Sequence, residues 1–309
     1  MGDPIVAFDD CDYTRIGLRP EQDESSGRTL GEVYDRYFRV VLARSDEDRE
    51  QSFRLRYQVY CLENAFEPAS RNPGERETDA HDAQSMHSLL MHRSSRLAVG
   101  TVRLILPRAS DAPLPLPIET VCPPAVLERY ADRIPGGRTA EISRFAVAKK
   151  YRRRVTADPV VDGNAGASRD SRSRHAVPNI CLGLMRAIVI MTRESGMSHL
   201  YAVMEPTLLR LLRNLGIYFE TLGPMVDYHG RRQPCYCDLD HLLATAYSHR
   251  PDVWAVLTDS GRIWPLYRWR RTPPDNLFRR PDGLPWFTGP RAYPARANSR
   301  LLNSIKGIS

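Results

Sequence analysis

The chain has 309 residues, of which 42% are hydrophobic and 26% charged, and these proportions are ordinary for a soluble globular protein. Its length is long for one compact core and short for two full domains. No run of the sequence approaches the roughly 18 consecutive apolar residues that a membrane span needs, and the N-terminal residues lack the basic and apolar regions of a secretory signal. We therefore expect a cytoplasmic protein.

The net charge of +7 is unevenly distributed. Residues 262–309 hold ten basic residues and two acidic ones, a balance of +8, which leaves about −1 for the rest of the chain. Aromatic residues are interleaved with the arginines of this region. Such a composition suits an anionic membrane surface or single-stranded nucleic acid, although a loosely packed C-terminal extension is the simplest of the three interpretations. We expect no nucleic acid partner, and peripheral contact of the tail with the inner face of a membrane stays open.

The six cysteines are scattered along the chain. Their scatter suggests reduced thiols rather than a disulfide framework. Cys235 and Cys237 are separated by one residue, which is too tight for the usual zinc-binding pair, and no second pair exists. We therefore expect no metal.

The strand and helix signals follow one another from residue 38 onward, after a polar, poorly periodic segment. Acidic residues fill the first turn of 46–62, as the helix dipole prefers, and Phe53, Tyr57 and Tyr60 recur there at helical spacing. The expected elements in chain order are strand 38–43, helix 46–62, strands 88–91 and 97–106, a strand centred on 142–147, helix 179–194, strand 200–204, helix 207–214, strand 217–219, helix 238–248 and a short extended piece at 253–257.

This order predicts an α/β fold, a mixed sheet with helices on both faces. We expect a flexible N-terminal arm at 1–30 and one domain over 31–265. A mobile insertion at 152–175 interrupts the domain, because that segment is rich in Arg, Ser, Asp and Gly and nearly without apolar residues. The Pro- and Arg-rich tail covers 266–309.

The predicted strand at 140–147 carries two opposite charges among apolar residues. Side chains alternate along a strand, so Glu141 and Ser143 are expected on one face and Ile142 and Arg144 on the other. Charges in an otherwise apolar strand are costly unless they are paired or hydrated. One solution is a strand that bulges beside a cleft, where Glu141 and Arg144 reach bound substrate. The alternative is a structural salt bridge, and the residues alone leave both open.

Four motifs in order resemble the acyl-homoserine-lactone synthases and their relatives in the Gcn5-related N-acyltransferase (GNAT) superfamily. They are Leu55–Tyr60, Glu77–Asp82, Gly100–Leu104 and Glu141–Phe145. Residues 228–234 and 250–254 are similar to the acyltransferases associated with the PEP-CTERM/exosortase system, a branch near the N-acyl amino acid synthases. The resemblance covers roughly 35–265. It implies a three-layer αβα GNAT-like fold with a mixed, mostly antiparallel sheet, and an enzyme that moves a fatty acyl group from an acyl carrier protein thioester to the amine of an amino acid or a related molecule.

The resemblance also implies which residues serve the reaction. Glu141 is expected to act as the base, because desolvation raises a carboxyl pKa towards neutrality, and Arg144 either holds a substrate carboxylate bidentately or pairs with the acids. The expected substrate-binding residues are Arg56, Tyr60, Phe66, Asp79, Asp82, Arg103, Ser143 and Phe145. Five of them have a structural alternative: Arg56 as a solvated helix residue, Asp79 and Asp82 as caps of the next element, and Tyr60 and Phe66 as core packing.

The acyl donor is predicted from the segment after residue 147. Relatives that use coenzyme A hold its pyrophosphate on a glycine-containing turn at a helix N-terminus, and this chain has no glycine there. The basic side chains of the segment after residue 147 suit the acidic face of an acyl carrier protein, or they belong to a solvated loop. No tightly bound cofactor is expected. The alternatives are a coenzyme-A-dependent acetyltransferase and a basic binding protein without chemistry. The expected carrier-protein contacts are Lys149, Lys150, Arg152, Arg153 and Arg154.

Overall fold

The computed structural model describes residues 29–107, 114–149, 151 and 169–265, all of which lie in one compact unit, Met1–Trp269. Their backbone forms an eight-stranded mixed sheet in the order β1-β2-β3-β4-β5-β8-β6, with β7 beside β8. The strands are β1 (Phe38–Leu42), β2 (Ser85–His92), β3 (Leu97–Ile105), β4 (Thr139–Val147), β5 (His199–Met204), β6 (Glu220–Thr221), β7 (Val226–Asp227) and β8 (Arg231–Asp238).

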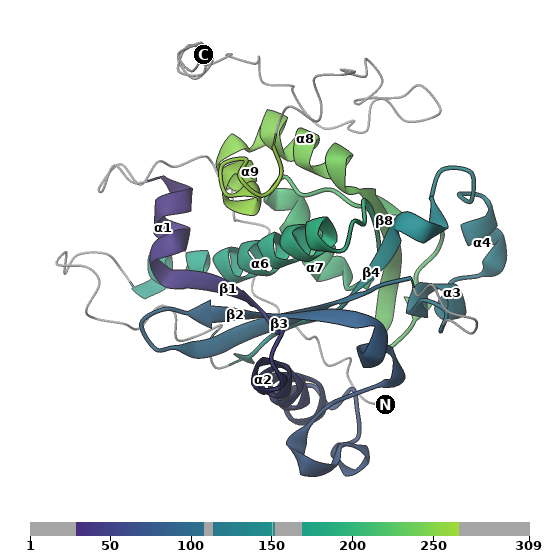
Figure 1. Cartoon of the computed structure of the whole chain (residues 1–309), viewed down its shortest axis with the longest axis horizontal. Helices are drawn as coiled ribbons and strands as arrows, with labels where there is room; N and C mark the ends of the chain where they lie inside the picture. The colour runs from purple at the N-terminus through teal and green to yellow at the C-terminus, as the bar shows by residue number, and fades with distance from the viewer. Residues whose placement is uncertain (1–28, 108–113, 150, 152–168, 266–309) are drawn as a thin grey trace. The chain divides into compact units, whose positions relative to one another are not determined.

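Helices cover both faces of this sheet (Figure 1). The long helix α6 packs across β1, β2, β3 and β4 on one face, and α9 packs on α6, whereas α2 lies against β2, β3 and β4 on the other face. The helices are α1 (Leu30–Tyr37), α2 (Asp46–Tyr57), α3 (Pro117–Val121), α4 (Pro124–Glu128), α6 (Arg169–Glu194), α7 (Pro206–Asn214), α8 (Leu239–His249) and α9 (Pro251–Thr258). The predicted αβα arrangement is confirmed. None of the described helices is long and apolar enough to cross a membrane.

Helix α2 has a capping residue and acidic side chains at its N-terminal end. The Ser45 side chain accepts a hydrogen bond from the Asp48 N–H, and three acidic residues fill the first turn, where the positive end of the helix dipole favours them. The helix then widens into a π-helical turn, η2 (Gln58–Glu63). Such wide turns are frequent at functional sites, and this one carries Tyr60.

The strand pairing leaves one opening in the sheet. β4 and β5 are parallel neighbours, and they pair only over 139–142 and 199–202. Beyond these residues β4 continues beside β3, and β5 continues beside β8. The two strands therefore diverge, and the edges that face each other no longer form a ladder.

The fold differs from the expectation in five places. Residues 253–257 belong to helix α9 rather than to an extended piece, and 217–219 precede the short strand β6 instead of forming a strand. Helix α1 and strand β8 were not predicted. Residues 169–175, assigned above to the insertion, lie at the start of α6; residues 152–168 lie outside the described part of the chain. Short elements such as α9 have weak periodic signals, so tertiary packing decides them.

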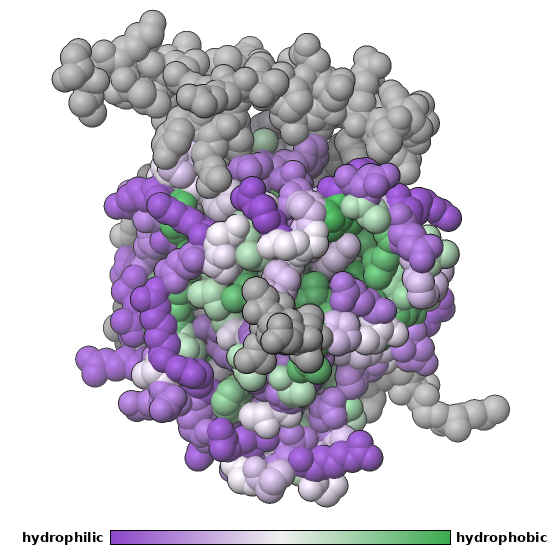
Figure 2. Space-filling view, turned by 45° about the vertical axis from the view of Figure 1, so that its right-hand side comes forward, coloured by the Kyte–Doolittle hydropathy of each residue, from purple (hydrophilic) through white to green (hydrophobic). Residues whose placement is uncertain are grey.

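The face of the molecule in Figure 2 is hydrophilic over most of its periphery, and its apolar residues gather between the charged ones. The main apolar core lies inside, between the sheet and the helices of the α6 side.

Candidate active site

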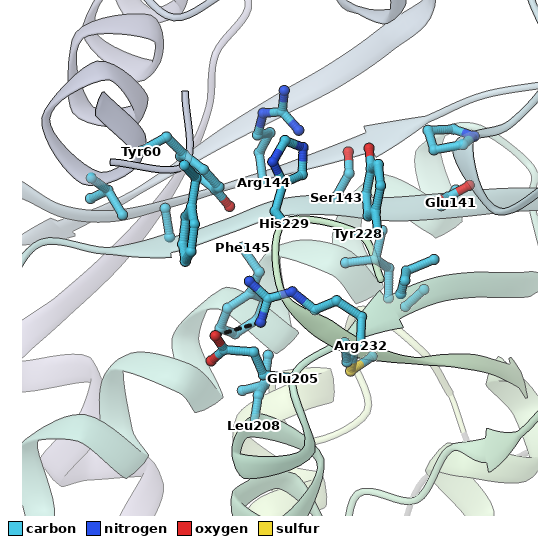
Figure 3. A pocket seen from close by; sticks show the side chains of 18 of the residues that line it. Tyr60, Glu141, Ser143, Arg144, Phe145, Glu205, Leu208, Tyr228, His229 and Arg232 are labelled. Atoms are coloured by element: carbon cyan, nitrogen blue, oxygen red, sulfur yellow. Dashed lines mark ion pairs between the residues drawn. The ribbon is translucent and has the colours of Figure 1, made fainter. Parts of the chain in front are cut away.

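A pocket opens where β4 and β5 diverge (Figure 3). Its volume is about 110 Å³. Side chains and backbone of β4 and β5 form its walls, and η2, α6, α7 and the turn before β8 complete it. The pocket is therefore the space between two strands that have separated, closed on the other sides by helices.

Strand β4 carries a bulge beside this pocket. Thr101 of β3 lies opposite Ala146, and Arg103 lies opposite Ser143. Over this stretch β4 therefore contains one residue more than β3. Arg144 has a φ of 50°, in the left-handed region that a non-glycine residue adopts at a cost on the order of 1–3 kcal/mol. Such an extra residue bends the strand and redirects its side chains.

The bulge brings consecutive side chains to the same side of the sheet. Ser143 Oγ accepts a hydrogen bond from Arg103 Nε (2.8 Å), and Arg144 pairs with Asp79, which also contacts Arg103. Regular alternation would have separated Ser143 from Arg144. The expectation of a bulged strand beside a cleft is confirmed, but the expectation that Arg144 faces away from Glu141 and Ser143 is wrong.

Glu141 is a buried carboxyl group in the wall of the pocket, with 2% of its surface exposed. The Ile118 N–H donates a hydrogen bond to its Oε2 (2.9 Å). Burial raises the pKa of Glu141 to about 8, although the Ile118 N–H and the charge of Arg103 act in the opposite direction. Such a group exchanges a proton near neutral pH, as a general base or acid must.

Three arginines and three acids form a largely buried ring of alternating charges, one member of which, Arg144, also lines the pocket. Each acid bridges two arginines, at N–O distances of 2.6 to 3.0 Å. The charges of the ring cancel, which is how buried ions are tolerated. We call this cluster the ion ring, and its members in order are Arg56, Glu77, Arg144, Asp79, Arg103 and Asp82.

The ring holds its acids in the ionised form. Burial by itself would raise the pKa of Glu77, but the hydrogen bonds and charges of Arg144 and Arg56 outweigh burial and hold that pKa below its usual range. The pKa values of Asp79 and Asp82 are lowered in the same way, against the effect of burial, by the neighbouring arginines. The predicted capping alternative also holds, because Asp79 accepts from the His81 N–H and Asp82 accepts from the Asp79 N–H.

The structure divides the predicted site residues into two groups. One group lines the pocket and consists of Tyr60, Phe66, Glu141, Ser143, Arg144 and Phe145. The other group lies in the ion ring behind Arg144 and consists of Arg56, Asp79, Asp82 and Arg103. Arg56 and Arg103 are 0% and 1% exposed. Their burial disfavours direct contact with a substrate in this pocket.

Tyr60 connects the two groups. Its ring lies under the Arg144 guanidinium, 5.2 Å from ring centroid to Cζ, and packs near Phe66 with 6.0 Å between centroids. A cation over an aromatic face is stabilised by the ring quadrupole. The aromatic pair and the ion ring therefore fix the orientation of Arg144 from both sides.

The predicted carrier-protein contacts are only partly within the described residues. The Lys149 N–H donates a hydrogen bond to the Glu63 carboxylate (2.9 Å). The other four predicted residues, Lys150, Arg152, Arg153 and Arg154, lie outside the described part of the chain.

The sequence analysis missed five residues of this region. Glu77 lies in a polar loop without periodic signal, although it opens one of the four motifs. The others come from α7 and the β7–β8 hairpin, whose strand β8 was not predicted, and they line the pocket (Figure 3). The signal that pointed to three of them was the branch-specific motif 228–234, to which no chemistry had been assigned. The missed residues are Glu77, Glu205, Tyr228, His229 and Arg232.

The family comparison agrees with this architecture. Residues 55–161 match the model described as the acetyltransferase (GNAT) domain, a segment that contains all members of the ion ring and Glu141. The match supports the predicted GNAT-type α/β fold and the prediction that the chain is an N-acyltransferase. A comparison by sequence with curated proteins finds no match.

Several solved structures are similar to this chain at low identity. TofI in a ternary complex with an inhibitor and MTA is 21% identical, with a TM-score of 0.47 over 68% of this chain and 95% of that chain. BjaI, a CoA-dependent acyl-homoserine lactone synthase with SAM and isopentyl-CoA, is 22% identical, with a TM-score of 0.45 over 74% and 90%. FeeM, an N-acyl amino acid synthase from uncultured soil microbes, is 13% identical, with a TM-score of 0.44 over 67% and 94%. Likenesses at this level do not fix a substrate or a mechanism.

Proposed function

We propose that this protein is an N-acyltransferase that moves a fatty acyl group from an acyl carrier protein thioester to the amine of an amino acid or a related small molecule. The observation that carries the proposal is the meeting of Glu141, whose pKa lies near neutrality, and the fixed cation of Arg144 in one pocket between diverging strands. Unpaired strand edges suit a thioester arm that contains amide groups, since such an arm can hydrogen-bond to them.

The reaction balances with residues of this pocket. The acceptor nitrogen attacks the thioester carbonyl carbon, a C–N bond forms, and the C–S bond breaks. The ionised Glu141 takes the proton from the nitrogen, directly or through one water molecule, and then gives this proton to the departing thiolate, which leaves as the thiol while Glu141 returns to its ionised form. Arg144 is immobilised by Glu77, Asp79 and the Tyr60 ring, so its guanidinium keeps one position in the wall of the pocket and needs no reorganisation during the reaction.

The acyl chain is assigned to the apolar end of the pocket. Phe145 and Val147 of β4, Met185 of α6 and Leu208 and Leu212 of α7 line it. A cavity of about 110 Å³ is somewhat smaller than the roughly 150 Å³ that holds benzene in an engineered cavity. A long chain therefore needs the flexible side chains at this end to move, and methionine does so easily.

Met185→Ala is accordingly expected to shift the preferred acyl chain towards chains longer by about two to three carbons, since methionine carries three heavy atoms beyond Cβ. The measurement is the ratio of kcat/KM values across a series of acyl donors. Met191→Ala is the matched control, because Met191 is buried in the same helix and does not line the pocket. Each variant should lose about 2–5 kcal/mol of stability, and an equal shift of chain length in both would contradict the assignment.

The donor is the second part of the proposal. The Lys149 N–H, at the start of the segment that follows β4, is already bonded to the Glu63 carboxylate. A carboxylate at this amide repels an approaching pyrophosphate and so disfavours coenzyme A relative to a carrier protein, whose single phosphodiester needs fewer contacts.

Purified protein supplied with long-chain acyl carrier protein, long-chain acyl-CoA and acetyl-CoA separates the candidates. We expect N-acyl product from the carrier protein thioester, identified by mass spectrometry against a panel of amines. Product from acetyl-CoA alone would overturn the proposal in favour of a small-acyl acetyltransferase, and the absence of product with every donor would favour a binding protein on the same fold.

Three finer features of the proposal come from the sequence alone. The similarity of 228–234 and 250–254 to the PEP-CTERM/exosortase-associated branch suggests that this enzyme operates with that system. The bulk composition supports a cytoplasmic location, and the basic, aromatic composition of residues 266–309 supports peripheral contact with an anionic membrane.

A further inference from the structure

Two arginines line the pocket, Arg144 and Arg232. Most of the N–H donors of Arg144 are already bonded to acids. Arg144 donates to both oxygens of Glu77 from Nε and to Glu77 and Asp79 from its NH2 group, at 2.8 to 3.1 Å. One guanidinium has five N–H donors, and the three on Nε and Nη2 of Arg144 serve two carboxylates. Of the two roles predicted for Arg144, pairing with the acids is the one that its contacts show.

Arg232 has a different set of contacts. It extends from β8 into the pocket (Figure 3), and 12% of its side chain is exposed. Its NH1 group pairs with Glu205, and its Cζ lies 5.4 Å from the centroid of the Phe66 ring. Within the described part of the chain, Nε and NH2 of Arg232 have no hydrogen-bond partner, so the guanidinium keeps donors for a ligand.

The surroundings of Arg232 favour a singly charged, planar anion. Burial lowers the pKa of Arg232, yet a guanidinium remains charged at physiological pH, so its remaining donors are both desolvated and cationic. A carboxylate matches two parallel N–H groups in one plane. A phosphate brings a second negative charge against Glu205, which already occupies the NH1 side, and is therefore disfavoured.

A histidine, His229, lines the same pocket as Arg232. Its backbone has a φ of 52°. Its ring packs near Phe66 and Tyr228 at centroid distances of 6.4 and 4.7 Å. Its Nε2 lies 3.5 Å from the Glu67 carboxylate. A left-handed backbone at a non-glycine residue persists only where the surroundings hold it, and His229 and Arg232 share the Phe66 ring as a neighbour in the pocket.

From these contacts we propose that Arg232 is the carboxylate-binding residue for the acyl acceptor, with His229 beside it, and that the acceptor is an amino carboxylic acid. The inference rests on the proposed function for the role of the amine, which Glu141 deprotonates on the β4 wall of the same pocket. The acceptor then spans the pocket, with its carboxylate on the β8 side and its nitrogen on the β4 side.

This arrangement selects for the carboxylate. The α-carboxamide of the acceptor offers Arg232 one neutral oxygen in place of two charged ones, and a decarboxylated amine leaves the donors of Arg232 without a partner. A hydrogen bond to a charged group contributes about 1.5–3 kcal/mol, which corresponds to about 10- to 100-fold in affinity. A site built to bind a polar group rejects the analogue that lacks it for the same reason.

Binding without acyl donor tests the inference independently of catalysis. The probes are the proteinogenic L-amino acids and their α-carboxamides, measured by ligand-observed NMR and calorimetry on the full chain. We expect at least one amino acid to bind, its amide to bind about 10- to 100-fold more weakly, and Arg232→Gln to remove that difference. Arg133→Gln is the matched control, because Arg133 pairs with Glu220 outside the pocket.

Arg232→Gln leaves Glu205 without its cation and is expected to reduce stability, so the double variant Glu205→Gln/Arg232→Gln, which removes both charges, is measured beside it. Equal binding of acids and amides to the wild-type protein, a preference for acids that survives in both variants, or no binding of any amino acid would each overturn the inference. Acylation of amines that lack a carboxylate, at the rate of the amino acids, would overturn it while leaving the N-acyltransferase proposal in place.

Discussion

Replacing Glu141 by Gln is expected to abolish acyl transfer while the protein stays folded. The amide has nearly the same shape as the carboxyl group and can still accept the Ile118 N–H hydrogen bond, but it cannot take a proton from the attacking amine. Loss of a general base typically lowers the rate about 10²- to 10⁴-fold. The measurement is kcat/KM for N-acyl product formation, with the far-ultraviolet circular dichroism of the variant as the check on folding.

The same substitution has a predictable effect on stability. The pKa of Glu141 is about 8 in the folded protein against an ordinary value of 4.5. The folded state therefore holds a proton that the unfolded state releases between those values, and the free energy of unfolding of the wild-type protein falls as the pH rises from about 4.5 to 8. The amide side chain of the variant does not titrate, so Glu141→Gln should raise the melting temperature relative to wild type at about pH 8 and leave it nearly unchanged at about pH 4.5.

The raised pKa also predicts the pH dependence of the reaction. If the ionised Glu141 is the base, kcat/KM should rise about tenfold per pH unit below pH 8 and level off above it. An acceptor amine of low pKa keeps the titration of the amine itself out of this range. Glu119→Gln is the matched control, because Glu119 is an exposed carboxylate near Glu141 that does not line the pocket. Full activity of Glu141→Gln would remove this residue from the mechanism.

Replacing Glu77 by Gln is expected to cause the largest loss of stability. Glu77 is 2% exposed and bridges Arg56 and Arg144, so its neutralisation leaves the ion ring with an excess positive charge in the interior. Breaking a buried ion pair by removal of one partner costs about 3–5 kcal/mol, which lowers the melting temperature by about 10 °C or more for a domain of this size. Chemical denaturation and calorimetry measure both quantities.

A matched control for Glu77 lies on the surface. Glu50 also bridges two arginines, Arg54 and Arg76, each at 2.7 Å, but its side chain is 32% exposed. Surface pairs contribute about 0–1 kcal/mol, so Glu50→Gln should be nearly neutral. If both variants lost a similar free energy of unfolding, the ion pairs of the ring would contribute no more stability than pairs on the surface.

Glu77→Gln should also reduce catalysis beyond its effect on folding, because Glu77 contributes three of the hydrogen bonds that orient Arg144. Activity measured well below the melting temperature of the variant separates this positioning effect from unfolding.

The local patterns of the sequence predicted most of the central sheet, and together with the family resemblance they pointed to six of the residues that line the pocket. Strands β1 to β5 are indicated by their apolar runs, and helix α2 by its acidic first turn and by aromatic residues at helical spacing. Glu141 and Arg144 were found because charges in an apolar strand are costly unless something compensates them. The segments at 217–219 and 253–257 were misassigned because short apolar runs fit a strand and a helix equally well.

The partners of these charges could not be predicted from the chain in the same way. The ion ring joins α2, the loop before β2, β3 and β4, and its members lie up to 88 residues apart, from Arg56 to Arg144. Nothing local in the sequence specifies which acid bridges which arginine, and Glu77 carries no periodic signal in its loop. Arg232 was missed because β8 was not predicted, so no residue of the hairpin could be placed in the pocket.

The sequence by itself determined an α/β chain, an apolar strand that carries two opposite charges and a basic, aromatic tail, since these depend on the composition and spacing of neighbouring residues. Only the tertiary structure decided which side of β4 presents Arg144, because a single extra residue at φ 50° reverses the alternation of side chains. It also decided that Arg144 is held in place by Glu77 and Asp79, whereas among the described residues Arg232 pairs only with Glu205 and keeps N–H donors for a ligand. Both outcomes follow from contacts between segments distant in the chain, and no local pattern encodes them.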